Sequence, residues 1–314
     1  MNEPFPPGVE VLAAAGSRDP EQARHNLQRL AGSSPSHQTV FQSIVPLLLD
    51  RLVNLADPDM ALNNLERYAE AVIDRGFLFS LFRDSPKSLD LLLTLFGSSQ
   101  YLSDALIRYP QDLHWLLEPG LLRRARSREE LIEELDGLLP RARSRQRLWT
   151  ALRRFKMRET LRIGLQDLLG NLDLTSVTQQ LSLMADVTLQ RAYEVCRDEL
   201  VRRHGEPRCA GSTDDKVCEF TIVGMGKLGG GELNFSSDID LLFVYEGEGE
   251  TAGLTGPTGA LVGKVSNHEF FTSLGESVIK AIGELTSEGR VFRVDMRLRA
   301  GGTVGSAGLF AERI

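Results

Sequence analysis

Residues 220–245 read FTIVGMGKLGGGELNFSSDIDLLFVY, and this stretch decides the fold of the chain around it. An apolar run from Phe220 to Val223 precedes a series of glycines, and a second apolar run extends from Leu241 to Tyr245. This order predicts a strand, a glycine-rich turn and a second strand. Side chains two positions apart in a strand share a face, so we expect Asp238 and Asp240 to lie about 6.5–7 Å apart at their Cα atoms. Two carboxylates beside a turn whose bare backbone can approach phosphates can hold divalent cations against a nucleotide.

A further strand is predicted over residues 290–299, RVFRVDMRLR. Apolar and charged residues alternate through it, so one face is apolar and the other carries Arg293, Asp295, Arg297 and Arg299. Neighbouring guanidinium groups repel each other unless an anion lies between them, and phosphate is the natural anion. The pattern therefore predicts a surface that faces phosphate.

Helical periodicity fills most of the chain before this region. Apolar residues recur at helical spacing, and proline, glycine and serine interrupt them. Ser127-Arg128-Glu129-Glu130 has the capping-box pattern of a helix start. Helices are expected over residues 21–30, 38–55, 59–73, in three or four short pieces within 76–119, after Ser127, and over 148–169, 177–203 and 267–285.

The hydrophobic periodicity changes from about 3.6 to about 2 residues after residue 205, and this change predicts the boundary between two regions of the chain. We expect an α+β protein, with a loose N-terminal lead-in over residues 1–20, an α-helical scaffold over 21–205 and a small mixed sheet flanked by helices over 206–314. Residues 208–216 form a hydrophilic linker in this prediction. Residues 246–266 alternate glycine with glutamate and threonine, which predicts a mobile loop.

The helix predicted over residues 148–169, LWTALRRFKMRETLRIGLQDLL, is basic. A solvated face is the ordinary interpretation of such a charge run. Arg154, Arg158 and Arg162 could instead form buried ion pairs that support the sheet, or a basic wall in direct contact with a phosphate ligand. The sequence does not decide among these alternatives.

Composition restricts the class of protein. The 314 residues include 42% hydrophobic and 25% charged residues, an ordinary globular balance for two domains or one large one. The net charge of -7 gives no electrostatic footprint for general nucleic-acid binding. The three cysteines lack C-x-x-C spacing and are expected to be buried or incidental thiols in a reducing compartment. No basic or long apolar leader and no run of roughly 20 apolar residues is present, so we expect a cytoplasmic protein without a membrane partner.

The glycine turn from Gly224 to Gly230, the Asp238-Ile239-Asp240 sequence and Asp295 on a later strand resemble the nucleotidyltransferase fold of DNA polymerase beta and its relatives. A closer resemblance is carried by GMGKLGGGELNFSSDIDLLFVY, FRVDMRLR and LRRFKMRETLRIGLQDLLG. These segments are similar to the N-terminal, adenylyl-removing part of the bifunctional glutamine synthetase adenylyltransferase/adenylyl-removing enzymes. Residues 62–119 are similar to the helical region that precedes the site in that family.

The resemblance implies a site. Asp238, Asp240 and Asp295 would be catalytic carboxylates that bind two Mg²⁺ ions. ADP or ATP would bind as product or ligand, and orthophosphate as co-substrate. The residues that would line the phosphates or neutralise their charge are Gly226, Lys227, Gly229, Gly230, Ser237, Arg297 and Arg299.

The resemblance also implies a reaction. The family's N-terminal part removes the adenylyl group from a tyrosine of glutamine synthetase by phosphorolysis, which releases ADP and regulates nitrogen assimilation. Adenylylated glutamine synthetase and a PII-type signal protein are the expected partners. Ala300 stands where the family usually has proline, and the family's domain continues beyond the point that corresponds to Ile314, so we expect a truncated chain. Two alternatives stay open: a catalytically silent module that binds nucleotide or docks glutamine synthetase, and a related uridylyltransferase that acts on a signal protein.

Overall fold

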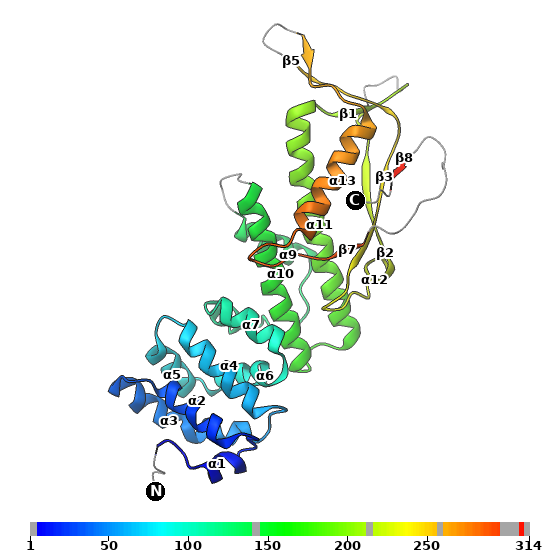
Figure 1. Ribbon diagram of the computed structural model, residues 1–314. Helices are drawn as coiled ribbons and strands as arrows, with labels where there is room; N and C mark the ends of the chain where they lie inside the picture. Colours follow the sequence, from blue (N-terminus) through cyan, green and yellow to red (C-terminus); the bar gives the residue numbers. More distant parts are fainter. Residues whose placement is uncertain (1–4, 140–144, 212–215, 256–259, 296–307, 311–314) are drawn as a thin grey trace. The chain divides into compact units, whose positions relative to one another are not determined.

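The computed structural model describes residues 5–139, 145–211, 216–255, 260–295 and 308–310 (Figure 1). Helices make up most of it, and small sheets follow them in the chain, which confirms the α+β class. The chain divides into two compact units, residues 1–125 with 160–173 and residues 126–159 with 174–314. These units are defined by contacts in space, whereas the regions 1–20, 21–205 and 206–314 were predicted from periodicity along the chain. The division into those three regions therefore stays a prediction.

The first unit contains helices that often begin at a polar capping residue or a proline. Asp57 and Asp74 cap two of them by accepting hydrogen bonds from the backbone N–H groups of Met60 and Phe77. Within this unit α4 packs against α2, α6 and α7. The helices are α1 (Val9–Ala14), α2 (Pro20–Ala31), α3 (Pro35–Leu52), α4 (Pro58–Ala71), α5 (Arg75–Asp84), α6 (Pro86–Ser98), α7 (Gln100–Arg108) and α8 (Asp112–Leu116).

The lead-in predicted to be loose is partly wrong, because α1 lies within it. Leu12 is completely buried, and this burial stabilises a helix that is too short to persist alone. The other expected helices of this unit are confirmed, and residues 76–119 contain four of them.

Four more helices follow, of which α10 and α11 are the longest in the described parts of the chain: α9 (Arg128–Leu138), α10 (Arg145–Leu168), α11 (Leu174–His204) and α13 (Asn267–Gly283). The predicted capping box at Ser127 is confirmed in both directions, since its hydroxyl accepts from the Glu130 N–H and the Glu130 carboxylate accepts from the Ser127 N–H. No helix in the described parts of the chain joins sufficient length to sufficient apolar character for crossing a lipid bilayer.

The main sheet is built around one central strand. β3 (Ile239–Tyr245) pairs antiparallel with β2 (Phe220–Met225), parallel with β7 (Val294–Asp295) and antiparallel with β8 (Gly308–Phe310). The one-turn helix α12 (Gly226–Gly229) follows β2. Two smaller sheets pair β1 (Pro207–Cys209) with β4 (Gly249–Thr251) and β5 (Leu254–Thr255) with β6 (Leu261–Val262).

Alternation along β3 separates a buried face from a half-buried one. Ile239, Leu241, Phe243 and Tyr245 are buried, whereas the residues between them are half-buried. On the buried side Phe271 of α13 stacks on Tyr245, with the ring centroids 5.0 Å apart. The opposite face therefore begins with Asp240 at the N-terminal end of the strand.

Two expectations about segments near the sheet are wrong, and a third is wrong in part. Residues 246–266 contain β4, β5 and β6, and the predicted linker 208–216 begins inside β1. Gly249 is required in β4 because a Cβ there would lie 1.9 Å from the Arg208 carbonyl oxygen. Of the strand predicted over 290–299, Val294–Asp295 is confirmed, residues 290–293 form no strand, and residues 296–299 lie outside the described residues. The preceding N–H groups of Val291 and Phe292 donate to the Ile282 carbonyl near the end of α13 instead of to the sheet.

Candidate functional site

The glycine turn after β2 is shaped around a carboxylate. Gly226 has a φ of 53°, and a Cβ there would lie 2.5 Å from a carboxylate oxygen of Asp240. A Cβ on Gly229 would lie 2.5 Å from the carbonyl oxygen of Gly224. Glycine at these two positions lets the turn fold back onto β2 and lets the Asp240 carboxylate approach its backbone.

Strand register brings Asp240 and Asp295 together. Asp240 is the Cα partner of Asp295 on the parallel neighbour β7 and of Met225 on β2. Residues in register on adjacent strands point to the same face, so these two carboxylates come from neighbouring positions of one sheet face. Asp240 and Asp295 are 55 positions apart in the sequence, and the sequence alone did not show that they pair. The chain passes through α13 between the two strands, and this crossover brings β7 alongside β3.

Asp238 lies directly before β3 and contacts the segment that leads into β7. Its Oδ1 accepts a hydrogen bond from Arg293 Nε at 2.5 Å, and the Ile239 N–H donates to the Arg293 carbonyl oxygen at 2.9 Å. Asp238 and Arg293 are partly exposed, at 37% and 62% of their side-chain surface. All three predicted catalytic carboxylates therefore lie at one end of the main sheet.

An open cavity of about 540 Å³ lies beside this end of the sheet. Asp238 and Asp295 line it together with three cations, Lys280, Arg290 and Arg293. Carboxylates next to cations around a solvent-filled space suit a metal-bound phosphate ester, because the carboxylates can bind Mg²⁺ and the cations can neutralise phosphate oxygens. Sequence reasoning assigned Arg293 to the correct face but did not include it, Arg290 or Lys280 in the site.

The residues predicted to line the phosphates differ in exposure, and two of them lie outside the described residues. Lys227, Gly229 and Gly230 are exposed on α12 and its end. Ser237 is half-buried, and its hydroxyl donates to Asn234 Oδ1 at 2.6 Å, which closes the loop immediately before Asp238. Arg297 and Arg299 lie outside the described residues, so their role stays a prediction.

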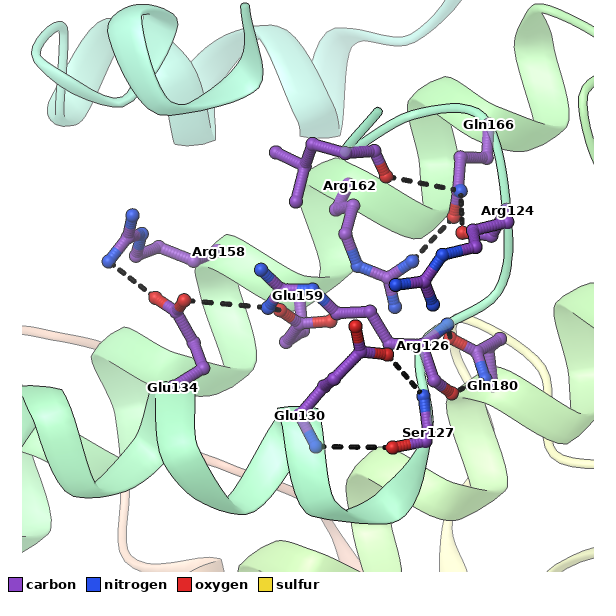
Figure 2. Close-up of polar contacts among 11 residues, drawn as sticks. Arg124, Arg126, Ser127, Glu130, Glu134, Arg158, Glu159, Arg162, Gln166 and Gln180 are labelled. Carbon is purple, nitrogen blue, oxygen red and sulfur yellow. Dashed lines mark hydrogen bonds and ion pairs between the residues drawn. The ribbon is translucent and has the colours of Figure 1, made fainter. Parts of the chain in front are cut away.

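Figure 2 shows two arginines of the basic helix α10, Arg158 and Arg162, that make polar contacts inside the protein. Arg158 contacts Glu134 of α9 at 2.7 Å, and both side chains are about 15% exposed. Arg162 is fully buried and donates to Gln166 Oε1 at 2.6 Å. Buried polar support is thus the observed role of Arg158 and Arg162, whereas Arg154 is half-buried and its predicted alternatives stay open.

Glu159 is the fully buried acid of the same helix. Arg126, which precedes α9, contacts Glu159 at 2.8 Å and Glu134 at 3.4 Å (Figure 2). The Arg126 backbone is also held by the Gln180 amide, which accepts from its N–H and donates to its carbonyl, each at 2.9 Å. This network joins α9, α10 and α11 within the second unit.

Arg153 connects α10 to the segment before β7. Its guanidinium donates to the carbonyl oxygens of Glu284 at 2.8 Å and Gly289 at 2.9 Å, and only 4% of the residue is exposed. Burial lowers the pKa of Arg153, while Glu284 and Glu288 act in the opposite direction. The arginine therefore helps to position the strand that carries Asp295.

Comparison with known proteins agrees with this architecture. A family model described as glutamate-ammonia ligase adenylyltransferase matches residues 89–311, which include the glycine turn and all three carboxylates. The chain belongs to this family. The resemblance to this family, inferred from the glycine turn with its aspartates, the FRVDMRLR segment and the helix LRRFKMRETLRIGLQDLLG, is thereby confirmed.

Similar proteins carry one descriptive name, bifunctional glutamine synthetase adenylyltransferase/adenylyl-removing enzyme. The protein of Thioalkalivibrio sulfidiphilus is 32% identical over 305 residues, which cover 94% of this chain and 31% of that protein. The Pseudomonas aeruginosa protein is 34% identical over 306 residues, 94% of this chain and 30% of its own length. The Burkholderia pseudomallei protein is 46% identical over 155 residues, 49% of this chain and 16% of its own length. The chain thus spans about a third of the first two relatives.

Proposed function

We propose that this chain catalyses Mg²⁺-dependent phosphorolysis of the adenylyl-tyrosine of glutamine synthetase, yielding ADP and the unmodified enzyme. The observation that carries the proposal is the meeting of Asp238, Asp240 and Asp295 at one end of the sheet, beside a cavity lined by cations. Membership of the family supplies the substrate class. The choice of removal rather than addition of the adenylyl group rests on the resemblance of GMGKLGGGELNFSSDIDLLFVY, FRVDMRLR and LRRFKMRETLRIGLQDLLG to the adenylyl-removing part of the family.

The donor set fits Mg²⁺, which prefers carboxylate oxygens, and Asp238, Asp240 and Asp295 would hold it. Bound Mg²⁺ would supply charge neutralisation at the phosphoryl oxygens and at the leaving phenolate. Arg293 and Lys280, which line the cavity, would bind and orient the attacking orthophosphate. Orthophosphate forms a new bond to the adenylyl phosphorus as the bond from phosphorus to the tyrosyl oxygen breaks, and the phenolate then takes a proton. No side-chain nucleophile is required.

The direct test measures ADP released from adenylylated glutamine synthetase in the presence of orthophosphate and Mg²⁺. The parent chain should release ADP, and the Asp238→Asn plus Asp240→Asn variant should be at least about 100-fold slower, because it loses metal ligands worth several kcal/mol of charge stabilisation. Asp198→Asn, an exposed carboxylate change on α11, is the matched control and should keep the parent rate.

Other outcomes separate the alternatives. An equal rate in the double variant would contradict the metal assignment. A parent chain that binds Mg²⁺ and ADP but releases no ADP from the substrate would favour the docking module. Regulation of nitrogen assimilation through a PII-type partner, and a cytoplasmic location, belong to the same proposal and would be tested in the host cell.

A further inference from the structure

A second cluster of metal-ligating groups lies at the opposite end of β3. The Sγ atoms of Cys209 and Cys218 and a carboxylate oxygen of Glu246 all lie within 4.8 Å of one another. Cys209 ends β1, Cys218 precedes β2 and Glu246 follows β3. Asp240 and Glu246 are six residues apart, about 20 Å along a strand, so this cluster is separate from the three carboxylates of the candidate active site.

Backbone pairing brings the two cysteines together. The Cys209 N–H donates to the Lys216 carbonyl at 3.2 Å, and the Cys218 N–H donates to the Pro207 carbonyl at 2.8 Å. This antiparallel pairing makes Cys209 and Cys218 diagonal neighbours on one face. The eight residues between them give no C-x-x-C pattern, and for that reason the sequence predicted only buried or incidental thiols.

Glu246 is held against the cysteines by the main sheet. Its N–H donates to the Glu219 carbonyl at 3.0 Å, which continues the ladder of β2 and β3 by one step. Asn267 of α13, which is fully buried, donates to the carbonyl oxygens of Arg208 at 2.9 Å and Gly247 at 3.0 Å. The backbone around all three donor groups is thus fixed independently of the donors themselves.

The spacing of the donors suits a tetrahedral ion. With Zn–S near 2.3 Å and Zn–O near 2.1 Å, tetrahedral geometry places two sulfurs about 3.8 Å apart and a sulfur and an oxygen about 3.6 Å apart. Cys209 Sγ lies 3.8 Å from Glu246 Oε2. A disulfide is less suitable, because diagonal neighbours are about 7–8 Å apart at Cα and a disulfide needs less than about 7 Å.

Donor chemistry and charge select the metal. Thiolates favour zinc over Mg²⁺ and Ca²⁺, and three protein ligands leave a fourth position for water. Two thiolates and one carboxylate carry three negative charges, so a divalent ion and the Lys216 ammonium, which contacts Glu246, would neutralise them. The thiol of Cys218 donates to the Gly247 carbonyl at 3.2 Å, and metal binding would replace this hydrogen bond.

We propose that Cys209, Cys218 and Glu246 form a zinc site that fastens β1 to the adjoining ends of β2 and β3. Its role is structural, since the ligands come from three separate segments and a bound ion would hold all three.

The test titrates the full chain with cobalt(II), after treatment with a chelator under reducing conditions. One equivalent should give the thiolate-to-cobalt charge-transfer absorption and the visible bands of a tetrahedral site, and zinc should abolish them by displacement. Cys209→Ser and Cys218→Ser should each weaken binding at least about 100-fold, since loss of even an outer-shell partner costs roughly 10–100-fold. Cys196→Ser, which changes the buried cysteine of α11, should bind as the parent does.

If a serine variant folds poorly, the proposal can still be tested by comparing melting temperatures with and without zinc. Zinc should raise the melting temperature of the parent and of Cys196→Ser, but not that of Glu246→Gln, which keeps the shape of the side chain. Absence of the charge-transfer band in the reduced parent would overturn the proposal. The same band in a Cys209→Ser plus Cys218→Ser variant, or its loss in Cys196→Ser, would also overturn it.

Discussion

Gly226 illustrates how one residue shapes the candidate active site. Its backbone is in the left-handed region, and the space where a Cβ would stand is taken by the Asp240 carboxylate. Gly231 shares the backbone conformation, with a φ of 69°, but a Cβ there would meet nothing within 4 Å. The two glycines therefore separate the effect of backbone strain from that of displacing a carboxylate.

Gly231→Ala should reduce the free energy of unfolding by about 1 kcal/mol through backbone strain and leave ADP release unchanged. Gly226→Ala should show a similar or larger loss of stability and, in addition, slow ADP release at least about tenfold, because the added methyl group displaces Asp240. Urea unfolding and the rate of ADP release measure the two effects. Equal rates in both variants would show that the position of Asp240 is irrelevant to the reaction.

Arg293 contacts the Asp238 carboxylate directly, and this contact supports a second prediction. Its pair with Asp238 is exposed, so Arg293→Met should change the free energy of unfolding by less than about 1 kcal/mol. The KM for orthophosphate should rise about tenfold or more, because a charge-assisted hydrogen bond contributes about 1.5–3 kcal/mol.

Arg203→Met is the matched control for Arg293→Met. Arg203 is 60% exposed and pairs with Glu199 within α11, so its replacement should leave the KM for orthophosphate unchanged. A fall in melting temperature without a change in KM would assign Arg293 to the scaffold instead.

At the scale of elements, a buried polar network connects α9, α10 and α11 in the unit that contains the sheet. Glu159 is fully buried and its partner Arg126 is 15% exposed. Glu159→Gln would leave a guanidinium without this partner in a poorly hydrated place and should lower the free energy of unfolding by about 3 kcal/mol. Urea unfolding measures the change.

Glu133→Gln provides the comparison on the exposed side of α9. This substitution should change the free energy of unfolding by less than about 0.5 kcal/mol. Similar losses in Glu133→Gln and Glu159→Gln would mean that burial of the ion pair does not determine its contribution.

Helices were predictable as elements because their signals are local. Asp57-Pro58, Ser85-Pro86 and the box at Ser127 each mark a helix start within one turn of chain. β1, β4, β5 and β6 were not predicted, because strands of two or three residues are too short to show a periodicity of two. β1 and β4 also depend on pairing between segments about 40 residues apart, whereas β5 and β6 pair with each other as a local hairpin. β7 begins later than predicted because the N–H groups of Val291 and Phe292 before it are bonded to the Ile282 carbonyl of α13.

At the scale of the whole molecule, the chain combines a unit whose described residues form only helices with a second unit that carries every described strand. The candidate active site and the proposed zinc site both lie in the second unit, at opposite ends of β3. We therefore expect bound zinc to stabilise the sheet that positions the carboxylates without taking part in the reaction.

The sequence by itself determined the helices other than α1 and α12, the strands on either side of the glycine turn, the α+β class and the family. All of these depend on short-range periodicity or on the order of residues in one segment. It also named Asp238, Asp240 and Asp295 as candidate ligands, although their binding of metal is still a prediction.

Only the tertiary structure decided which of these groups meet. The register of β3 and β7 brings Asp240 to Asp295, ion pairing brings Arg293 to Asp238 and Arg158 to Glu134, and strand pairing brings Cys209 to Cys218. Most of these contacts join residues far apart in the chain. A sequence pattern shows which face a side chain occupies, but the register between separate segments is set by packing and hydrogen bonding of the whole fold.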